Sequence, residues 1–218
     1  MKRIIIICEG QTEQEFCKDV LQPHFNSKEI YLHLPTIKRS GGGIVPWPAF
    51  KKQIENHLLQ DKEAFVTTFV DYYGIHDKHN FPEWGMSKQM IDKNAKMTFL
   101  ESSMFAAIDV DISNRFIPYM QLHEFEGLLF NDIEVFNANF SQHELIGKTE
   151  LEQTIINYPN PELINDTPQN APSHRLNRLI KGYNKIVYGS ILAENIGLIK
   201  IRNKSPRFNN WITTLENL

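Results

Sequence analysis

The stretch Ile4-Ile5-Ile6-Ile7-Cys8-Glu9-Gly10 decides the fold of this chain of 218 residues. Its first five residues are apolar and mostly β-branched, which is typical of a strand buried on both faces of a parallel sheet. The strand ends at Glu9-Gly10. Thr12 is followed three residues later by Glu15, the pattern of a capping box, so we expect a helix to begin at Thr12.

Similar patterns recur along the first 130 residues. We expect further strands at 30–38, 64–70 and 116–122, and a helix at 49–59. Pro23 is expected to end or kink the first helix. Buried strands that alternate with helices predict an α/β fold, with a mostly parallel sheet flanked by helices.

We expect a single compact unit with two parts. Residues 1–130 form the α/β core, which includes a helical insertion at 76–112 where methionines and other apolar residues recur at helical spacing. Residues 131–218 form a helical, basic extension packed on the core, with one helix running from Ser173 to about Tyr188. Hydrophobic residues make up 41% of the chain, enough for an ordinary globular core.

Charge is distributed unevenly along the chain, whose net charge is −3. From Ser173 to Leu218 there are eight Lys and Arg against two Asp and Glu, whereas the first 172 residues carry 15 against 24. Such a basic segment on an acidic body either holds a phosphate-bearing partner or is a solvated helix face. Four of its basic residues are expected on roughly one helix face: Arg175, Arg178, Lys181 and Lys185.

The sequence favours a cytoplasmic protein without a membrane contact. Cys8 and Cys17 are the only cysteines, so a disulfide framework is excluded and reducing conditions fit best. The first apolar run is too short for a signal peptide, and no stretch approaches the roughly 20 apolar residues of a membrane span.

Carboxylates follow three of the expected strands. Glu9 follows the first, Asp71 follows the strand at 64–70, and Glu124 and Glu126 follow the strand at 116–122. Because ligand sites in open α/β sheets form at the carboxyl ends of the strands, we expect these acids to converge in one cleft, together with Glu13. Neighbouring carboxylates ionise together only if a cation joins them, and ligands that offer only oxygen suit Mg²⁺ or Mn²⁺.

These acids predict a metal site that serves phosphoryl transfer. Glu9, Asp71 and Glu124 are the predicted ligands, and Glu13 and Glu126 complete the shell or act as general base. A single carboxylate at a strand end is more often a helix cap or a solvated turn residue. The prediction therefore rests on the fact that several acids occupy the same position, directly after a strand.

Three residues are predicted to contact a phosphate: Arg175, Lys185 and Gly10. The run Gly41-Gly42-Gly43 lacks the Gly-Lys-Ser/Thr of a Walker loop, and it either admits a phosphate backbone or is a plain turn. An aromatic group could stack bases or pack in the core; its members are Tyr72, Tyr73, Phe81 and Trp84.

Several motifs together resemble known families. Cys8-Glu9-Gly10-Gln11-Thr12-Glu13 resembles the first motif of Toprim domains in the overcoming-lysogenization-defect type of nuclease, where an acidic residue and Gly end the first strand and a second Glu lies four residues later. The wider set resembles the domain of unknown function family 4276, nearly end to end. That set consists of residues 9–13, 70–74, 123–130 (His-Glu-Phe-Glu-Gly-Leu-Leu-Phe), 171–176 and Arg202.

This resemblance implies a Toprim/Rossmann-like fold and divalent-metal chemistry on nucleic acid. It also implies a bacterial or archaeal source and a role in phage defence beside an ATPase partner. The chain departs from the Toprim pattern at Asp71-Tyr72-Tyr73, where Toprim domains carry Asp-x-Asp. The second acid would then come from Glu124, Glu126 or Asp77, or the site holds one metal ion or is inert.

Three functions therefore stay open. The first is a metal-dependent nuclease or related phosphoryl-transfer enzyme, and the second is a non-catalytic subunit that binds an ATPase or nucleic acid. The third is a nucleotide-binding module. The sequence does not distinguish DNA from RNA, and it does not give the oligomeric state.

Overall fold

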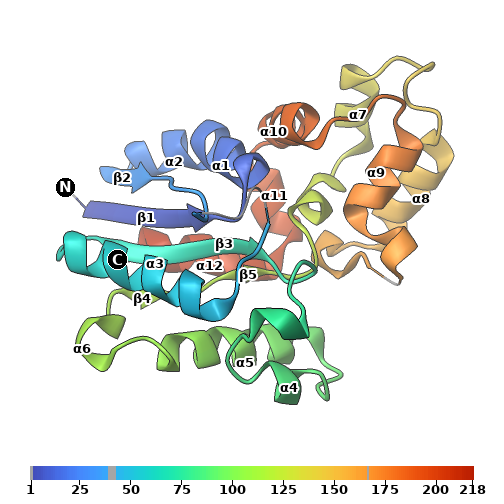
Figure 1. Ribbon diagram of the computed structural model, residues 1–218. Helices are drawn as coiled ribbons and strands as arrows, with labels where there is room; N and C mark the ends of the chain where they lie inside the picture. The colour runs from blue at the N-terminus through green and yellow to red at the C-terminus, as the bar shows by residue number, and fades with distance from the viewer. Residues whose placement is uncertain (1, 39–42, 166) are drawn as a thin grey trace.

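Strand β1 (Lys2–Cys8) lies inside a parallel sheet and pairs on both sides (Figure 1). The computed structural model describes residues 2–38, 43–165 and 167–218. Within them the strand order is β2-β1-β3-β4, and β5 also pairs with β3. The remaining strands are β2 (Ile30–His33), β3 (Phe65–Asp71), β4 (Phe116–Ile117) and β5 (Met120–Gln121). The α/β class and the mostly parallel sheet expected from the sequence are confirmed.

The expected strand at 116–122 is in fact two short strands on the same edge of β3. Pro118 interrupts the ladder because proline has no backbone N–H to donate. The Thr68 hydroxyl fills the gap: it donates to the Tyr119 carbonyl at 2.8 Å and accepts from the Tyr119 N–H at 3.0 Å. The strand expected at 30–38 is also shorter, and beyond His33 only an isolated bridge joins Thr36 to Cys8.

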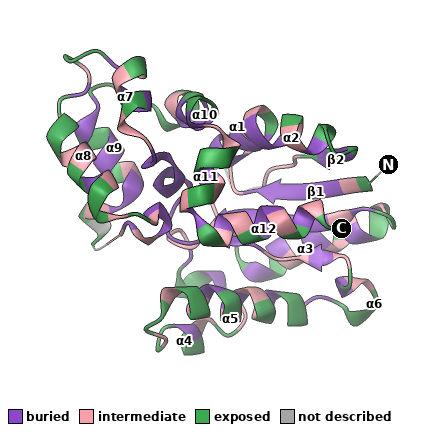
Figure 2. Cartoon of the chain, turned by 180° about the vertical axis from the view of Figure 1, so that it is seen from behind, coloured by how far each residue is buried: buried purple, intermediate pink, exposed green. Residues whose placement is uncertain are grey.

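Both faces of the sheet are buried, which explains the unbroken apolar run in β1. Ile4 and Ile6 belong to one hydrophobic cluster, and Ile5 and Ile7 belong to another. The second cluster is covered by α3 (Trp47–Gln60) and α5 (Lys93–Ala106). On the opposite face, seen in Figure 2, α12 (Pro206–Glu216) runs along the sheet.

The first helix begins one residue earlier than expected and has a different cap. Helix α1 (Gln11–Phe16) has Gly10 at its N-cap, and the Glu13 carboxylate accepts the Gly10 N–H at 2.8 Å. The predicted capping box of Thr12 and Glu15 is therefore wrong. The chain stays helical past Pro23, through a π-helical segment (Cys17–Leu21) and α2 (Gln22–Asn26), because the widened turn accommodates the proline.

The expected helical insertion holds two short helices, α4 (Trp84–Ser87) and α6 (Val110–Ser113), on either side of α5. The methionines Met97 and Met104 on α5 are core residues, whereas Met86 is exposed.

The C-terminal part is helical, as expected, and it completes the core of the sheet. Trp211 of α12 donates its indole N–H to the Thr67 hydroxyl of β3 at 2.9 Å, and the ring of Phe208 lies 5.8 Å from that of Phe16. The boundary at residue 130 stays a prediction. The helices before α12 are α7 (Ile133–Asn139), α8 (Lys148–Asn157), α9 (Pro172–Leu179), α10 (Lys185–Ile196) and α11 (Leu198–Lys204).

The single helix expected from Ser173 to Tyr188 is wrong. The chain leaves the helix after Leu179, Gly182 takes a left-handed φ of 77°, and α10 then begins afresh. The Asn184 side chain caps α10 by accepting the N–H groups of Ile186 and Val187. The four basic residues at 175–185 therefore lie on two helices and a loop, not on one helix face. No helix in the described part of the chain is long and apolar enough to cross a membrane.

Candidate active site at the carboxyl edge of the sheet

Glu9 and Asp71 lie at the point where the chain changes direction across the sheet. From β1 the chain passes to β2 on one side, and it then returns through α3 to form β3 on the other side of β1. The connections after β1 and β3 therefore diverge, which opens a crevice at the carboxyl ends of these two strands. Across this crevice the Asp71 N–H donates to Glu9 Oε2 at 2.9 Å.

Glu124 is brought to the same edge by the segment after β5. The N–H groups of Tyr72 and Tyr73 donate to the carbonyls of Gln121 and His123, which extends the pairing beyond the strands. His123 has a φ of 67°, an uncommon value for a residue other than glycine. Such strained backbone conformations persist where the surrounding contacts enforce them. Directly after this turn, Glu124 enters the site.

Hydrogen bonds from other elements fix the position of these acids. Asp71 Oδ1 accepts the N–H of Phe125 at 2.9 Å. Glu124 accepts both the N–H and the hydroxyl of Ser173, at 2.9 and 3.0 Å. The sheet, the segment after β5 and the first turn of α9 are thus linked through carboxylates.

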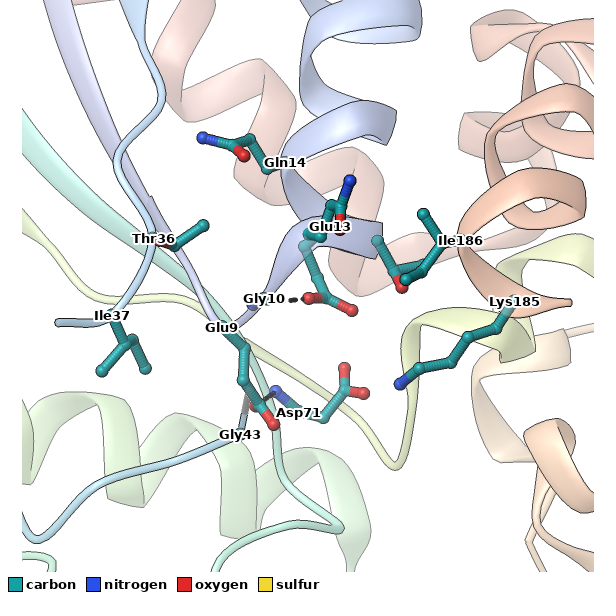
Figure 3. A pocket seen from close by; sticks show the side chains of 12 residues that line it. Glu9, Gly10, Glu13, Gln14, Thr36, Ile37, Gly43, Asp71, Lys185 and Ile186 are labelled. Atoms are coloured by element: carbon teal, nitrogen blue, oxygen red, sulfur yellow. Dashed lines mark hydrogen bonds between the residues drawn. The ribbon is translucent and has the colours of Figure 1, made fainter. Parts of the chain in front are cut away.

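Two cavities that share lining residues lie beside these groups. The smaller has a volume of about 130 Å³ and is lined by Glu9, Asp71, Tyr73, Gly74, Glu124, Glu126, Ser173 and Lys185. The larger has a volume of about 620 Å³ and shares three of these residues, Glu9, Asp71 and Lys185. Figure 3 shows the Glu13 and Asp71 carboxylates and the Lys185 ammonium pointing toward one another. We refer to the two cavities together as the acidic cleft.

Burial raises the pKa values of four acids in the cleft, Glu9, Glu13, Asp71 and Glu126, and for all but Glu13 repulsion from neighbouring carboxylates adds to the rise. Burial, opposed in part by the hydrogen bond from Asp71, raises the pKa of Glu9 to about 7, and Glu13 and Glu124 add to the rise. Burial and Glu124 raise the pKa of Glu126 to about 7. Burial and the neighbouring carboxylates also hold the pKa of Asp71 well above its usual range.

Lys185 is the one cation among the described residues that line the cleft. Burial alone would lower its pKa, but Glu126 and the other carboxylates outweigh this effect and raise it. One lysine faces the five carboxyl groups of Glu9, Glu13, Asp71, Glu124 and Glu126. The site therefore has a surplus of negative charge when its acids ionise.

This donor set fits a hard divalent cation in its chemistry. The lining carboxylates offer oxygen ligands, and a cation would offset the burial and the repulsion that raise the pKa values of Glu9, Asp71 and Glu126. As the side chains stand, no three His, Cys, Asp or Glu within 2–38, 43–165 and 167–218 form a group that could hold a metal ion. Glu9, Asp71 and Glu124 are the residues that would supply the ligands.

Some predicted site residues lie elsewhere. Arg175 is buried on α9, where its guanidinium donates to the Asn170 carbonyl at 2.8 Å and lies 3.7 Å from Glu150. It is not among the residues that line the cleft. Asp77, the other candidate for the second acid, is exposed and pairs with Lys88 and the Trp84 indole.

Gly10 lines the larger cavity, but its N–H is already bonded to Glu13. Of the predicted glycine loop, residues 41 and 42 lie outside the described part of the chain, whereas Gly43 lines the larger cavity with a φ of 107°. Among the aromatic candidates, Phe81 packs in the core against Trp47, and Tyr72 packs against Trp84.

Sequence reasoning missed the roles of Ser173 and Gly74. Ser173 positions Glu124 from a distance of 49 residues, and no local pattern marks such a contact. A Cβ atom on Gly74 would lie 3.4 Å from Glu9 Oε1, so the absence of a side chain there leaves room for the carboxylate. The position of Gly74, three residues after Asp71 at a strand end, was the available signal.

One comparison with known proteins gave a match. The family model described as Domain of unknown function (DUF4276) matches residues 8–216. No curated protein and no solved structure matches the chain at a significant level.

Proposed function

The chain belongs to the DUF4276 family, and we propose that this member is a nuclease that uses Mg²⁺ or Mn²⁺ to hydrolyse phosphodiester bonds in nucleic acid. The observation that carries the proposal is the acidic cleft. Carboxyl groups from separate segments of the chain line it at the carboxyl edge of the sheet, between β1 and β3, with one lysine among them. Packing does not account for this grouping, because buried like charges repel.

The residues of the cleft have distinct parts in this chemistry. Glu9, Asp71 and Glu124 would hold the cation, which supplies Lewis-acid polarisation of the phosphate and a more acidic water. Lys185 provides the ammonium that meets a substrate phosphate. Glu126, whose pKa is raised to about 7, is suited to accept a proton near neutral pH.

The proposal requires the carboxylates to move closer together on binding, since as they stand they form no coordination group. Each has acceptor positions for this: an ionised carboxylate offers about four, and the hydrogen bonds to Glu9 and Asp71 each use one.

A cleavage assay tests the proposal. Plasmid, single-stranded DNA and tRNA are incubated with the protein in Mg²⁺, in Mn²⁺ and in a chelator. We expect cleavage of at least one substrate that depends on metal and falls by at least about a hundredfold in Asp71→Asn, as for a charged group that acts in the transition state. The control is Glu194→Gln, an exposed position on α10 outside the cleft. Cleavage that survives in Asp71→Asn would contradict the proposal.

A second candidate is a non-catalytic subunit of an ATPase complex in phage defence. The hydrogen bonds favour it, because Glu13, Asp71 and Glu124 each accept a backbone N–H and are satisfied in part without a cation. In this case no substrate is cut, and the protein co-purifies with an ATPase from a neighbouring gene whether or not Asp71 is changed to Asn. For both candidates we propose a cytoplasmic location, which suits the two free, buried cysteines.

A further inference from the structure

We infer that the acidic cleft takes a flexible single strand of nucleic acid and does not take a duplex. This inference rests on the proposed function and deepens it by naming the substrate class. It follows from the small number of basic side chains that can contact a phosphate and from the burial of carboxylates in the cleft.

The basic C-terminal segment has few cations to spare. Arg202 pairs with Glu216 at 2.8 Å and Arg207 pairs with Glu101 at 2.6 Å. Four other basic residues of the segment make polar contacts with the rest of the protein: Arg175 and Arg178 contact Glu150, Lys200 contacts Asp132, and Lys204 contacts the Asn131 carbonyl.

Arg202 thus pairs within the segment, and the other five residues hold the segment on the acidic body. Two of the eight basic residues in the segment, Lys181 and Lys185, make none of these side-chain hydrogen bonds or ion pairs. Of these two, only Lys185 lines the cleft.

Among the described residues, those that line the wide part of the cleft are mostly polar and otherwise uncharged. Beyond its acids and Lys185, its described lining consists of Gly10, Gln11, Thr12, Gln14, Thr36, Ile37, Gly43 and Ile186. Binding of duplex nucleic acid depends on several Lys or Arg side chains that replace counterions on the phosphates. One lysine and one bound cation neutralise few phosphates, so we expect weak affinity for a duplex.

Three of the five acids are also recessed, whereas Glu9 and Asp71 are partly exposed. Glu13, Glu124 and Glu126 are each less than 10% exposed, so a scissile phosphate has to enter the cleft to reach them. A duplex presents its phosphates on a stiff, convex surface, whereas an unstacked strand bends into a cavity. The volume of about 620 Å³ falls in the range of pockets for small-molecule and cofactor ligands.

Fluorescence anisotropy tests the inference separately from cleavage. A labelled short single strand and a labelled duplex with closed hairpin ends are titrated with the wild-type protein in Ca²⁺, between about 50 and 200 mM salt. We expect the single strand to bind more tightly, with a slope of log affinity against log salt of about −0.7 to −1.4, the value for one or two phosphates on a single strand.

Two lysine variants complete the design. Lys185→Met is expected to make the slope shallower by about 0.7, the share of one phosphate contact, while Lys181→Met leaves it unchanged. Equal or tighter binding of the duplex, a slope steeper than about −3, or no binding of the single strand would overturn the inference.

The two proposals fail differently. If Mg²⁺-dependent cleavage is equally fast on both substrates, the single-strand inference is wrong and the nuclease proposal stands. If the single strand binds preferentially but nothing is cut, the nuclease proposal is wrong and the strand preference stands.

Discussion

Neighbours from other elements hold three carboxyl groups of the acidic cleft in place. Glu9 accepts the N–H of Asp71, Asp71 accepts the N–H of Phe125, and Glu124 accepts two hydrogen bonds from Ser173. The bonds to Glu9 and Asp71 favour the charged form of these two acids, whereas burial favours the neutral form, and burial prevails. Glu9, whose pKa is raised to about 7, is therefore close to its protonation equilibrium at neutral pH.

Glu126 provides a pH test at this scale. Burial first, and then Glu124, raise its folded-state pKa from 4.5 to about 7, so the native state keeps a proton that the unfolded chain has released. Stability is therefore expected to fall as pH rises from about 4.5 to about 7. Glu126→Gln stays neutral throughout, so its Tm should decline less over this interval and exceed that of the wild type at higher pH.

Thermal melts in a chelator measure this effect. Glu194→Gln is the matched control, because its exposed side chain should leave the wild-type pH profile unchanged. A Glu126→Gln profile that runs parallel to the wild-type profile would show that Glu126 titrates near its ordinary value in the folded protein.

At the level of elements, the sequence predicts the strands better than the helix ends. The apolar runs at β1 and β3 are local and continuous, so they were placed to within two residues. The first helix cap was placed wrongly, because the sequence offers two pairs with the three-residue spacing of a capping box. These pairs are Gly10 with Glu13 and Thr12 with Glu15. The break after Leu179 was missed, because it depends on a left-handed Gly182 that a helical pattern does not exclude.

The N-terminus of α12 depends on a residue that no local pattern identifies. Glu162 is buried, and its two oxygens accept the N–H groups of Arg207 and Phe208 at 2.9 and 3.0 Å. The first N–H groups of a helix have no partner within the helix, so a carboxylate that reaches them from elsewhere acts as a cap. The contact spans 45 residues, which explains why the sequence did not reveal it.

We predict that Glu162→Ala lowers the free energy of unfolding by about 1–3 kcal/mol, because the buried N–H of Phe208 and the partly buried N–H of Arg207 lose their acceptor. Urea denaturation gives this value. Glu194→Ala, at an exposed position, should change it by less than about 0.5 kcal/mol. An equally small effect of Glu162→Ala would mean that water replaces the carboxylate at this cap.

Across the whole molecule, ion pairs join the basic C-terminal segment to the acidic body. The charge imbalance was visible in the sequence, but its meaning was not, because the partners lie far apart in the chain. Arg207 and Glu101, for example, are separated by 106 residues. The carboxylates of the cleft were easier to predict, since Glu9 and Asp71 follow strands that bring their carboxyl ends to one edge.

The pair of Arg207 and Glu101 is expected to matter more than the exposed pair of Arg178 and Glu150. The side chains of the first pair are 13% and 16% exposed, and those of the second are 45% and 44% exposed. Arg207→Met leaves a desolvated carboxylate behind, and we predict a loss of the order of 3 kcal/mol in unfolding free energy. Arg178→Met should cost less than about 1 kcal/mol.

Urea denaturation of these variants, together with the double variant Arg207→Met with Glu101→Gln, measures the difference. The double variant should recover part of the loss, because it leaves no unpaired charge. If Arg207→Met and Arg178→Met cost the same, burial does not set the strength of the contacts that hold the segment.

The central claim is that the acidic cleft binds a divalent cation, and isothermal titration of the metal-free protein with Mn²⁺ tests it most directly. We predict saturable binding to the wild type, with release of protons near pH 7 because Glu9 and Glu126 are partly protonated there. Asp71→Asn should lose most of this binding, and Glu194→Gln should keep it. If the wild type shows no saturable binding, or if Asp71→Asn binds Mn²⁺ as the wild type does, the metal site at the carboxyl edge of the sheet does not exist.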